Sequence, residues 1–245
     1  MLNSKDNSLL YGNMQAEEYF LPYKEQIKEW LKIKPEYDSY EYTQDNLCII
    51  NIRGGEYTGS PELFVRRKYW LDSIAYMKKI RSDMKFITIT DDVEAAKRIL
   101  PEVEAYHFSL DKDYVTIKNA KYLIASNSSF AFFPVFTSDT LKMIIAPKYW
   151  ARHNVSDGYW SSEQNIYTGF HYQDRKGKIF TAEECRKELE EYKKTSKKYR
   201  NVDIHLKGMD LFMMKIQSKS RFYFYQTQRF VRAVLRRVRL LTGKN

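Results

Sequence analysis

Between residues 47 and 147, short apolar runs alternate with longer stretches of helical periodicity. The apolar runs cover residues 47–52, 85–90, 103–109, 122–126 and 141–147, and helical stretches cover residues 61–81, 92–100 and 113–120. Strands that are apolar throughout are buried on both faces, and their alternation with helices is typical of a parallel sheet covered by helices on both sides. We therefore expect an α/β fold with a Rossmann-like parallel sheet and flanking helices.

The composition fits a folded protein in a reducing compartment. Apolar residues make up 43% of the 245 residues, which argues against disorder. The two cysteines, Cys48 and Cys185, match no disulfide framework or metal-ligand spacing. The first twenty residues are polar, and no run of eighteen apolar residues occurs, so we expect neither a signal peptide nor a membrane span. A cytoplasmic location is the expectation.

The charge is divided unevenly along the chain. Residues 193–245 hold 15 Lys/Arg against 2 Asp, a net charge of +13, so that the remainder carries 10 − 13 = −3. We predict an N-terminal helix (15–32) and linker over residues 1–46, a Rossmann-like domain over 47–180 and a basic helical tail over 181–245. The asymmetry indicates a body with its own task and a tail that meets an anionic partner.

Polar clusters follow the strands at residues 52, 90 and 125. In parallel sheets ligands bind at the carboxyl ends of the strands, so these clusters are the loops of interest. The first, NIRGGEY, places Arg53 beside two glycines, where a guanidinium can grip phosphate oxygens and the backbone can approach closely. The alternative is a plain turn whose arginine lies on the surface.

The other two clusters each allow two interpretations. In SNSSF, residues 126–130, hydroxyl groups and the first N–H groups of a helix form a potential anion site, or Ser128 or Ser129 is only an N-cap. For Asp91 and Asp92 we favour a helix cap over a carboxylate pair that binds a divalent cation. The four histidines make no ligand pattern.

Taken together, the quoted loops resemble one family. NIRGGEY, FITITDD, DYVTIKNAKYLIASNSSFAFF and IIAPKYW occur in the order and spacing of the bacterial α-1,2-fucosyltransferases, glycosyltransferase family 11. GNMQAEEYF, residues 12–20, resembles a stretch upstream of those motifs. The resemblance covers about residues 11–150. It implies one half of a two-domain GT-B enzyme, the donor-binding half, without the family's N-terminal glycine-rich segment, and so a truncated or diverged product.

The resemblance also implies roles for individual residues. Arg53, Ser128, Ser129 and the backbone of Phe130 would contact the diphosphate of a GDP-sugar, and Asp113 would read the guanine or ribose. The full set of donor-binding candidates is Asn51, Arg53, Gly55, Asp113, Asn127, Ser128, Ser129 and Phe130. The donor would be GDP-fucose or another GDP-sugar, the acceptor a glycan hydroxyl in surface polysaccharide synthesis, and the transfer inverting and metal-independent, with no cofactor.

The chain departs from the family pattern at several of these positions. Asn51 stands in place of His, Gly54 in place of a second Arg and Glu56 in place of Asp, while Phe132 and Phe133 replace a Trp pair. One guanidinium fewer weakens stabilisation of the departing GDP. This loss keeps open the alternative of a nucleotide-binding or interaction protein without transferase activity.

Few side chains near the first loop could perform the transfer chemistry. The candidates for catalysis are Arg53, Glu56 and Glu62, the last two as bases for the acceptor hydroxyl. Glu62 could equally decorate the first turn of its helix, where a carboxylate favours the helix dipole.

The end of the chain, residues 221–241, has the pattern of a basic amphipathic helix. Arg229, Arg232, Arg236 and Arg239 recur at helical spacing on one side, opposite an apolar side. This pattern favours an interfacial anchor on an anionic membrane, peripheral on the inner face of the plasma membrane. The alternatives are a terminal helix packed on the body and, less favoured for want of any accompanying motif, binding to nucleic acid.

Overall fold

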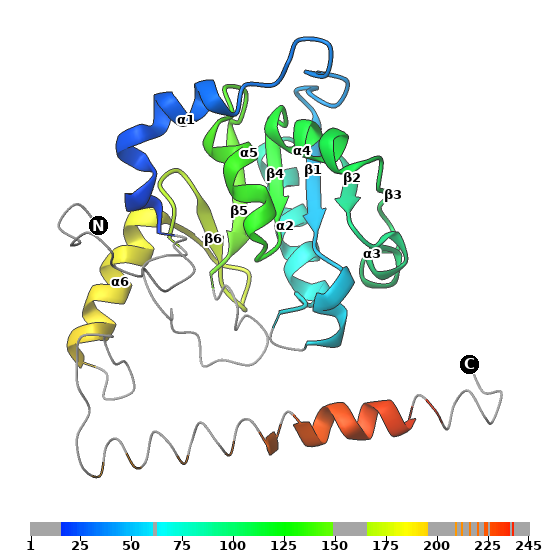
Figure 1. The fold of residues 1–245 in the computed structure, drawn as a ribbon, viewed down its shortest axis with the longest axis vertical. Helices are drawn as coiled ribbons and strands as arrows, with labels where there is room; N and C mark the ends of the chain where they lie inside the picture. The colour runs from blue at the N-terminus through cyan, green and yellow to red at the C-terminus, as the bar shows by residue number, and fades with distance from the viewer. Residues whose placement is uncertain are drawn as a thin grey trace, which may run out of the picture. The chain divides into compact units, whose positions relative to one another are not determined.

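The computed structural model describes residues 16–60, 63–148 and 166–195, together with positions 209, 212, 216, 220, 223–224, 226–235 and 237. Within these residues one sheet has the strand order β3-β2-β1-β4-β5-β6-β7 (Figure 1). The strands are β1 Leu47–Ile52, β2 Lys85–Thr90, β3 Ala105–Tyr106, β4 Tyr122–Ala125, β5 Met143–Pro147, β6 His171–Gln173 and β7 Ile179–Thr181. Neighbours pair parallel from β3 to β6, and only β7 runs antiparallel. The expected α/β, Rossmann-like sheet is confirmed.

The sheet is wound in two directions from its centre. The chain runs outward from β1 through β2 to β3 and then returns to place β4 on the other side of β1. The helices are α1 Lys24–Trp30, α2 Arg67–Ile80, α3 Val93–Ile99, α4 Leu110–Lys118, α5 Phe132–Phe136 and α6 Ala182–Thr195. Right-handed crossovers put helices on opposite faces when the direction reverses. Figure 1 shows α4 and α5 in front of the sheet and α2 behind it.

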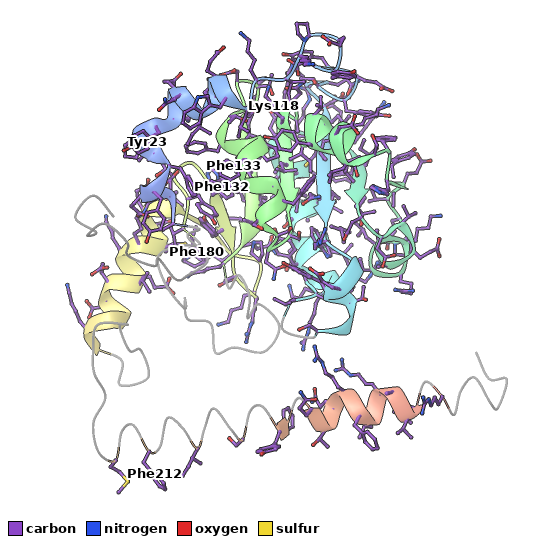
Figure 2. All side chains as sticks on the ribbon, viewed as in Figure 1. Tyr23, Lys118, Phe132, Phe133, Phe180 and Phe212 are labelled. Atoms are coloured by element: carbon purple, nitrogen blue, oxygen red, sulfur yellow. The ribbon has the colours of Figure 1, made fainter. Side chains whose placement is uncertain are left out.

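Strand β1 is the centre of the core, and the side chains of the described residues are drawn in Figure 2. All six of its residues are buried, and its side chains at Cys48 and Ile50 face a cluster that includes Trp70 and Met77 of α2. On the same helix, the Tyr69 hydroxyl donates a 2.7 Å hydrogen bond to the carbonyl of Ala125. This hydrogen bond joins α2 to the end of β4, next to the loops that follow the carboxyl ends of the strands.

Several element boundaries differ from those predicted. The helix expected over 61–81 begins only at Arg67, because the N–H groups of Leu63 and Phe64 both close turns on the Ser60 carbonyl. The strand expected over 103–109 is reduced to β3, and α4 begins at Leu110 with Ser109 as its cap. The helix expected over 15–32 is divided: two 3₁₀ turns, η1 Glu17–Tyr19 and η2 Leu21–Tyr23, precede α1.

The chain separates into two units, residues 1–196 and 197–245. The helix α6 belongs to the first unit and contacts β6 and β7, although the sequence placed it in the tail. Its start is a capping box, in which the Thr181 hydroxyl accepts from the Glu184 N–H and the Glu184 carboxylate accepts from the Thr181 N–H. Among the described residues, no helix has the length and apolarity needed to cross a bilayer.

Candidate functional site

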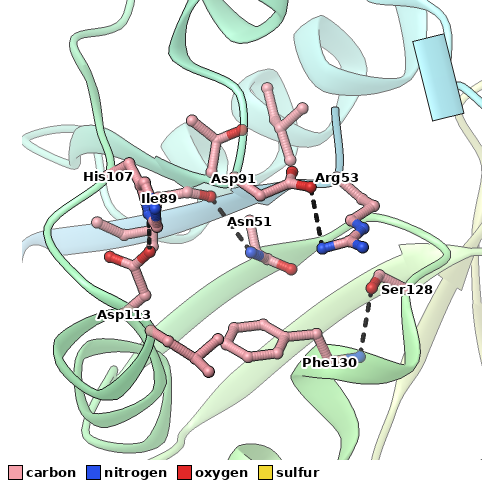
Figure 3. Close-up of a pocket in the computed structure, with 11 residues that line it drawn as sticks. Asn51, Arg53, Ile89, Asp91, His107, Asp113, Ser128 and Phe130 are labelled. Carbon is pink, nitrogen blue, oxygen red and sulfur yellow. Dashed lines mark hydrogen bonds and ion pairs between the residues drawn. The ribbon is translucent and has the colours of Figure 1, made fainter. Parts of the chain in front are cut away.

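A pocket opens at the carboxyl ends of β1, β2 and β4 (Figure 3). Its lining residues are Asn51, Ile52, Arg53, Ile89, Thr90, Asp91, His107, Leu110, Asp113, Ser128 and Phe130. β1 and β4 are the neighbouring strands between which the winding direction reverses. In doubly wound sheets this reversal is where the loops diverge and leave a crevice for a ligand. The three polar clusters that the sequence marked do meet at one edge of the sheet.

Arg53 is the cation of this pocket, and its position is fixed on several sides. Its Nη1 lies 2.9 Å from Asp91 Oδ2, its Nη2 lies 3.5 Å from Glu56 Oε1, and the guanidinium lies over the ring of Tyr57. Burial raises the pKa of the Tyr57 hydroxyl, so this ring stays neutral beside the cation. The Glu56 contact is long and exposed and contributes little, so ligand oxygens can replace it at small cost.

The adjacent residues Asp91 and Asp92 make different contacts. Asp92 caps α3, with its carboxylate accepting from the Ala95 N–H at 2.9 Å, as predicted. Asp91 instead turns to the loop after β1, where one oxygen binds Arg53 and the other accepts a 2.8 Å hydrogen bond from the Gly54 N–H. Asp91 is therefore the residue that holds the loop after β1 against the end of β2.

Gly54 lies where a side chain has no room. A Cβ atom there would lie 2.5 Å from the Asp92 Cβ and 3.1 Å from the Ala95 Cβ. The next residue, Gly55, has a φ of +32°, which disfavours any other residue. A second arginine at position 54 would require the loop to move away from α3.

Asn51 offers an unused acceptor to the pocket. The residue is only 5% exposed, and its Nδ2 donates a 3.2 Å hydrogen bond to the Ile89 carbonyl, which fixes the amide. Its Oδ1 is buried and has no hydrogen-bond partner. Buried oxygens of this kind are rare because an unpaired one costs about 1–3 kcal/mol. A donor from a ligand would satisfy it.

At the other end of the pocket, Asp113 holds His107 in place. Asp113 is 4% exposed; its Oδ2 lies 2.6 Å from His107 Nδ1, and its Oδ1 accepts from the Phe108 N–H at 3.1 Å. Both carboxylate oxygens are thus engaged within the chain. This contact engages Nδ1 and orients the imidazole ring, so that Nε2 is the ring nitrogen available to a ligand.

The SNSSF turn forms a tighter structure than the predicted helix start. Ser128 caps a short 3₁₀ turn, η4 Ser129–Ala131, by accepting from the Phe130 N–H at 3.3 Å, and α5 that follows has only five residues. The cap interpretation is therefore confirmed for Ser128. The Phe130 N–H that the resemblance assigned to a phosphate is already engaged, and a ligand would have to compete for it.

The structure brings together part of the predicted set. Five of the donor-binding candidates line the pocket: Asn51, Arg53, Asp113, Ser128 and Phe130. Its lining does not include Gly55, Glu56, Asn127 or Ser129. The Glu56 side chain is 73% exposed and pairs with Arg53 from outside the pocket, a poor position for a catalytic base. Glu62, Arg236 and Arg239 lie outside the described residues.

Two ionisable residues of the pocket, His107 and Asp91, were not predicted from the sequence as site residues. His107 was set aside because the histidines are scattered along the chain, yet it lies six positions before Asp113, with the helix cap Ser109 between them. Asp91 was interpreted as a cap. The signal that separates it from Asp92 is that a helix start uses one cap, which leaves the second carboxylate for another partner.

The fold is that of an α/β protein with a pocket at the reversal of a doubly wound sheet, lined in part by charged and polar side chains. This is where proteins of this class bind nucleotides. Among the described residues, no group of three or more His, Cys, Asp or Glu side chains is placed to hold a metal ion.

A comparison with curated proteins identifies a relative that is a sugar transferase. The chain is 28% identical over 158 residues to an alpha-1,2-colitosyltransferase of Escherichia coli. The match covers 57% of this chain and 54% of the relative, so the chain matches about half of that protein. No protein-family model matches, and neither does any solved structure. A distant relative of this chain is thus a glycosyltransferase.

Proposed function

We propose that the protein is a glycosyltransferase that takes its sugar from a GDP-sugar bound in the pocket at the carboxyl edge of the sheet. One observation carries the proposal: side chains from three strand ends converge beside a single fixed guanidinium, at the reversal of the sheet. The relationship to a colitosyltransferase supports sugar transfer as the reaction. The family resemblance favours fucose as the sugar and a glycan hydroxyl as the acceptor.

The pocket suggests how the donor would lie. The diphosphate would face Arg53 and the Ser128 hydroxyl, since these are a cation and a donor on neighbouring strand ends. The nucleoside would extend toward His107 and Asp113 at the other end, with a ribose hydroxyl donating to the unpaired Oδ1 of Asn51. Arg53 would balance the charge that develops on the leaving nucleotide as the sugar bond breaks.

A second function, nucleotide binding without transfer, has an observation in its favour. Of the predicted bases, Glu56 lies outside the pocket, and Gly54 leaves no space for a second guanidinium. This arrangement supports binding more directly than it supports departure of a nucleotide. The two functions share the donor site and differ only in whether label passes from the donor to an acceptor.

Calorimetric titration with GDP tests the donor site, and separate titrations with UDP and ADP are the controls for nucleotide specificity. Micromolar binding corresponds to about 8 kcal/mol, and loss of a charge-assisted contact worth about 1.5–3 kcal/mol weakens it by roughly ten- to a hundredfold. We expect this loss in Arg53→Ala. The matched control is Arg81→Ala. Arg81 is an exposed arginine that pairs with Asp83 at the C-terminal end of α2 and does not line the pocket.

Three results would decide between the functions. Absence of binding to every nucleotide, or equal binding by Arg53→Ala and the wild type, would contradict the donor site. Specific binding to GDP with transfer of label from GDP-fucose, or from a colitosyl donor, to a glycan would establish the transferase and its sugar. Binding to GDP without transfer or hydrolysis of either donor would favour the second function.

A further inference from the structure

The tail contains a helix whose two sides differ in chemistry. Its described residues are 223–224, 226–235 and 237. At 100° per residue, one side carries an apolar face, made of Phe230, Val231, Val234 and Leu235. The opposite side carries a basic face, of which Arg229 and Arg232 are described. Arg237, which is also described, lies at the border of the apolar face beside Phe230. The remaining described residues confirm the amphipathic pattern.

The apolar face is exposed to solvent within the second unit, residues 197–245. Phe230 is 70% exposed and Leu235 is 53% exposed, while Val231 and Val234 are also open to solvent. A helix with a wide apolar stripe normally buries it against another element. Here four neighbouring apolar side chains form a continuous exposed patch on one helix, which marks a surface for interaction.

The charge around the helix selects the kind of partner. From residue 211 to the end, the sequence has nine Lys/Arg and no Asp or Glu. A second copy of the chain could cover the apolar face, but it would bring an equal positive charge to the contact. A nucleic acid would satisfy the arginines and leave the apolar face in water. An anionic lipid surface is complementary to both faces at once.

We propose that this helix lies in the interface of an anionic membrane. The apolar face would enter the boundary of the acyl chains, and Arg229 and Arg232 would contact the phosphate groups of the lipids. Such lipids line the inner face of the plasma membrane. The proposal does not depend on the proposed function, because it uses none of the residues of the nucleotide pocket.

Co-sedimentation of the full chain with lipid vesicles tests the proposal. Vesicles of phosphatidylcholine with phosphatidylglycerol are compared with vesicles of phosphatidylcholine alone. We expect the wild type to bind only the anionic vesicles. The double variant Phe230→Ser, Val234→Ser and the double variant Arg229→Gln, Arg232→Gln should each weaken this binding by at least about tenfold.

Matched control variants remove side chains of the same kinds, apolar or positively charged, from the first unit. Trp30→Ser removes an apolar side chain that is also 70% exposed, and the double variant Lys78→Gln, Lys79→Gln removes two exposed charges from α2. These variants should bind vesicles as the wild type does. Thermal melts of every variant check that the body is folded, and since the tail substitutions lie on exposed positions we expect no change.

Other outcomes would overturn the proposal in a recognisable way. Equal binding to both kinds of vesicle would overturn the requirement for an anionic surface, and binding that survives both tail variants would exclude this helix as the anchor. Pelleting of DNA together with failure to bind vesicles would assign the basic face to nucleic acid. Self-association that is lost in the Phe230→Ser, Val234→Ser variant, again without vesicle binding, would show that a second copy covers the apolar face.

Discussion

At the scale of single residues, neighbouring aspartates illustrate how one short motif serves two purposes. Asp92 satisfies a free N–H at the start of α3, a role that any N-cap residue could fill. Asp91 joins the loop after β1 to the end of β2 through Arg53 and the Gly54 N–H. Only the second contact bears on the pocket, because it fixes the direction of the guanidinium.

This difference leads to a prediction for a pair of alanine variants. Asp92→Ala should lower the free energy of unfolding by about 1 kcal/mol, the usual cost of a lost cap, and leave nucleotide affinity unchanged. Asp91→Ala should weaken nucleotide binding by about tenfold, because Arg53 loses the partner that orients it. Urea unfolding and calorimetry on both variants measure the two effects. Equal affinity in both variants would show that Arg53 is oriented without Asp91.

At the scale of elements, the position of Gly54 shows how closely the loop after β1 is packed against α3. The Cα of Gly54 faces the Cβ atoms of Asp92 and Ala95, so that an added methyl group overlaps both. Packing of this kind is a property of two elements in contact. It is invisible in the loop sequence, where two consecutive glycines indicate only a turn.

We therefore predict that Gly54→Ala destabilises the protein and Gly59→Ala does not. The cost at Gly54 should be about 1–3 kcal/mol, the range found for overpacked interiors. Gly59 is the matched control, because a Cβ there meets no atom within 4 Å and it lies at the end of the 3₁₀ turn η3, Gly55–Gly59, that begins just after Gly54. Thermal or urea unfolding compares the two. A Gly54→Ala variant as stable as Gly59→Ala would show that the loop can move away from α3.

The elements also show how far the sequence alone could lead. The strands at 47–52 and 85–90 were predicted with the observed bounds, because each is a short run rich in isoleucine and other strand-forming residues and is bounded by polar residues. The hairpin of β6 and β7 was missed, since each strand has only three residues and depends on pairing with β5 and with its partner. Its turn still had a local signal in Gly177, which adopts a φ of +90°.

The same limit applies to the pocket. Arg53 was predicted from its place after a strand beside two glycines, and Asp113 from the resemblance of the loops to a known family. The contact of His107 with Asp113 depends on the short strand β3 and on the start of α4, neither of which the periodicity located correctly. Motifs thus identified which loops matter. The partners of each side chain depended on tertiary contacts that no local pattern encodes.

At the scale of the first unit, residues far apart in the sequence close the side of the sheet near β6. Glu17, in the 3₁₀ turn η1, is 6% exposed. Its Oε2 accepts from the Thr168 N–H at 2.9 Å and from the Thr168 hydroxyl at 2.7 Å, and it lies 3.4 Å from Nη2 of Arg186 on α6. One carboxylate therefore joins the beginning of the described chain, the loop before β6 and the last helix of the unit.

Because these three segments depend on one buried acceptor, Glu17→Ala should destabilise the unit as a whole. Removal of the carboxylate leaves the Thr168 N–H without its partner and leaves Arg186 with only its longer ion pair, 3.8 Å to Glu183, which together cost about 2–3 kcal/mol. Glu18→Ala is the matched control, since Glu18 is the exposed neighbour in the same turn. Urea unfolding should show the loss only for Glu17→Ala. If Glu17→Ala unfolds at the same urea concentration as Glu18→Ala and the wild type, the Glu17 carboxylate contributes nothing to the stability of the unit, and its contact with α6 is only a surface contact.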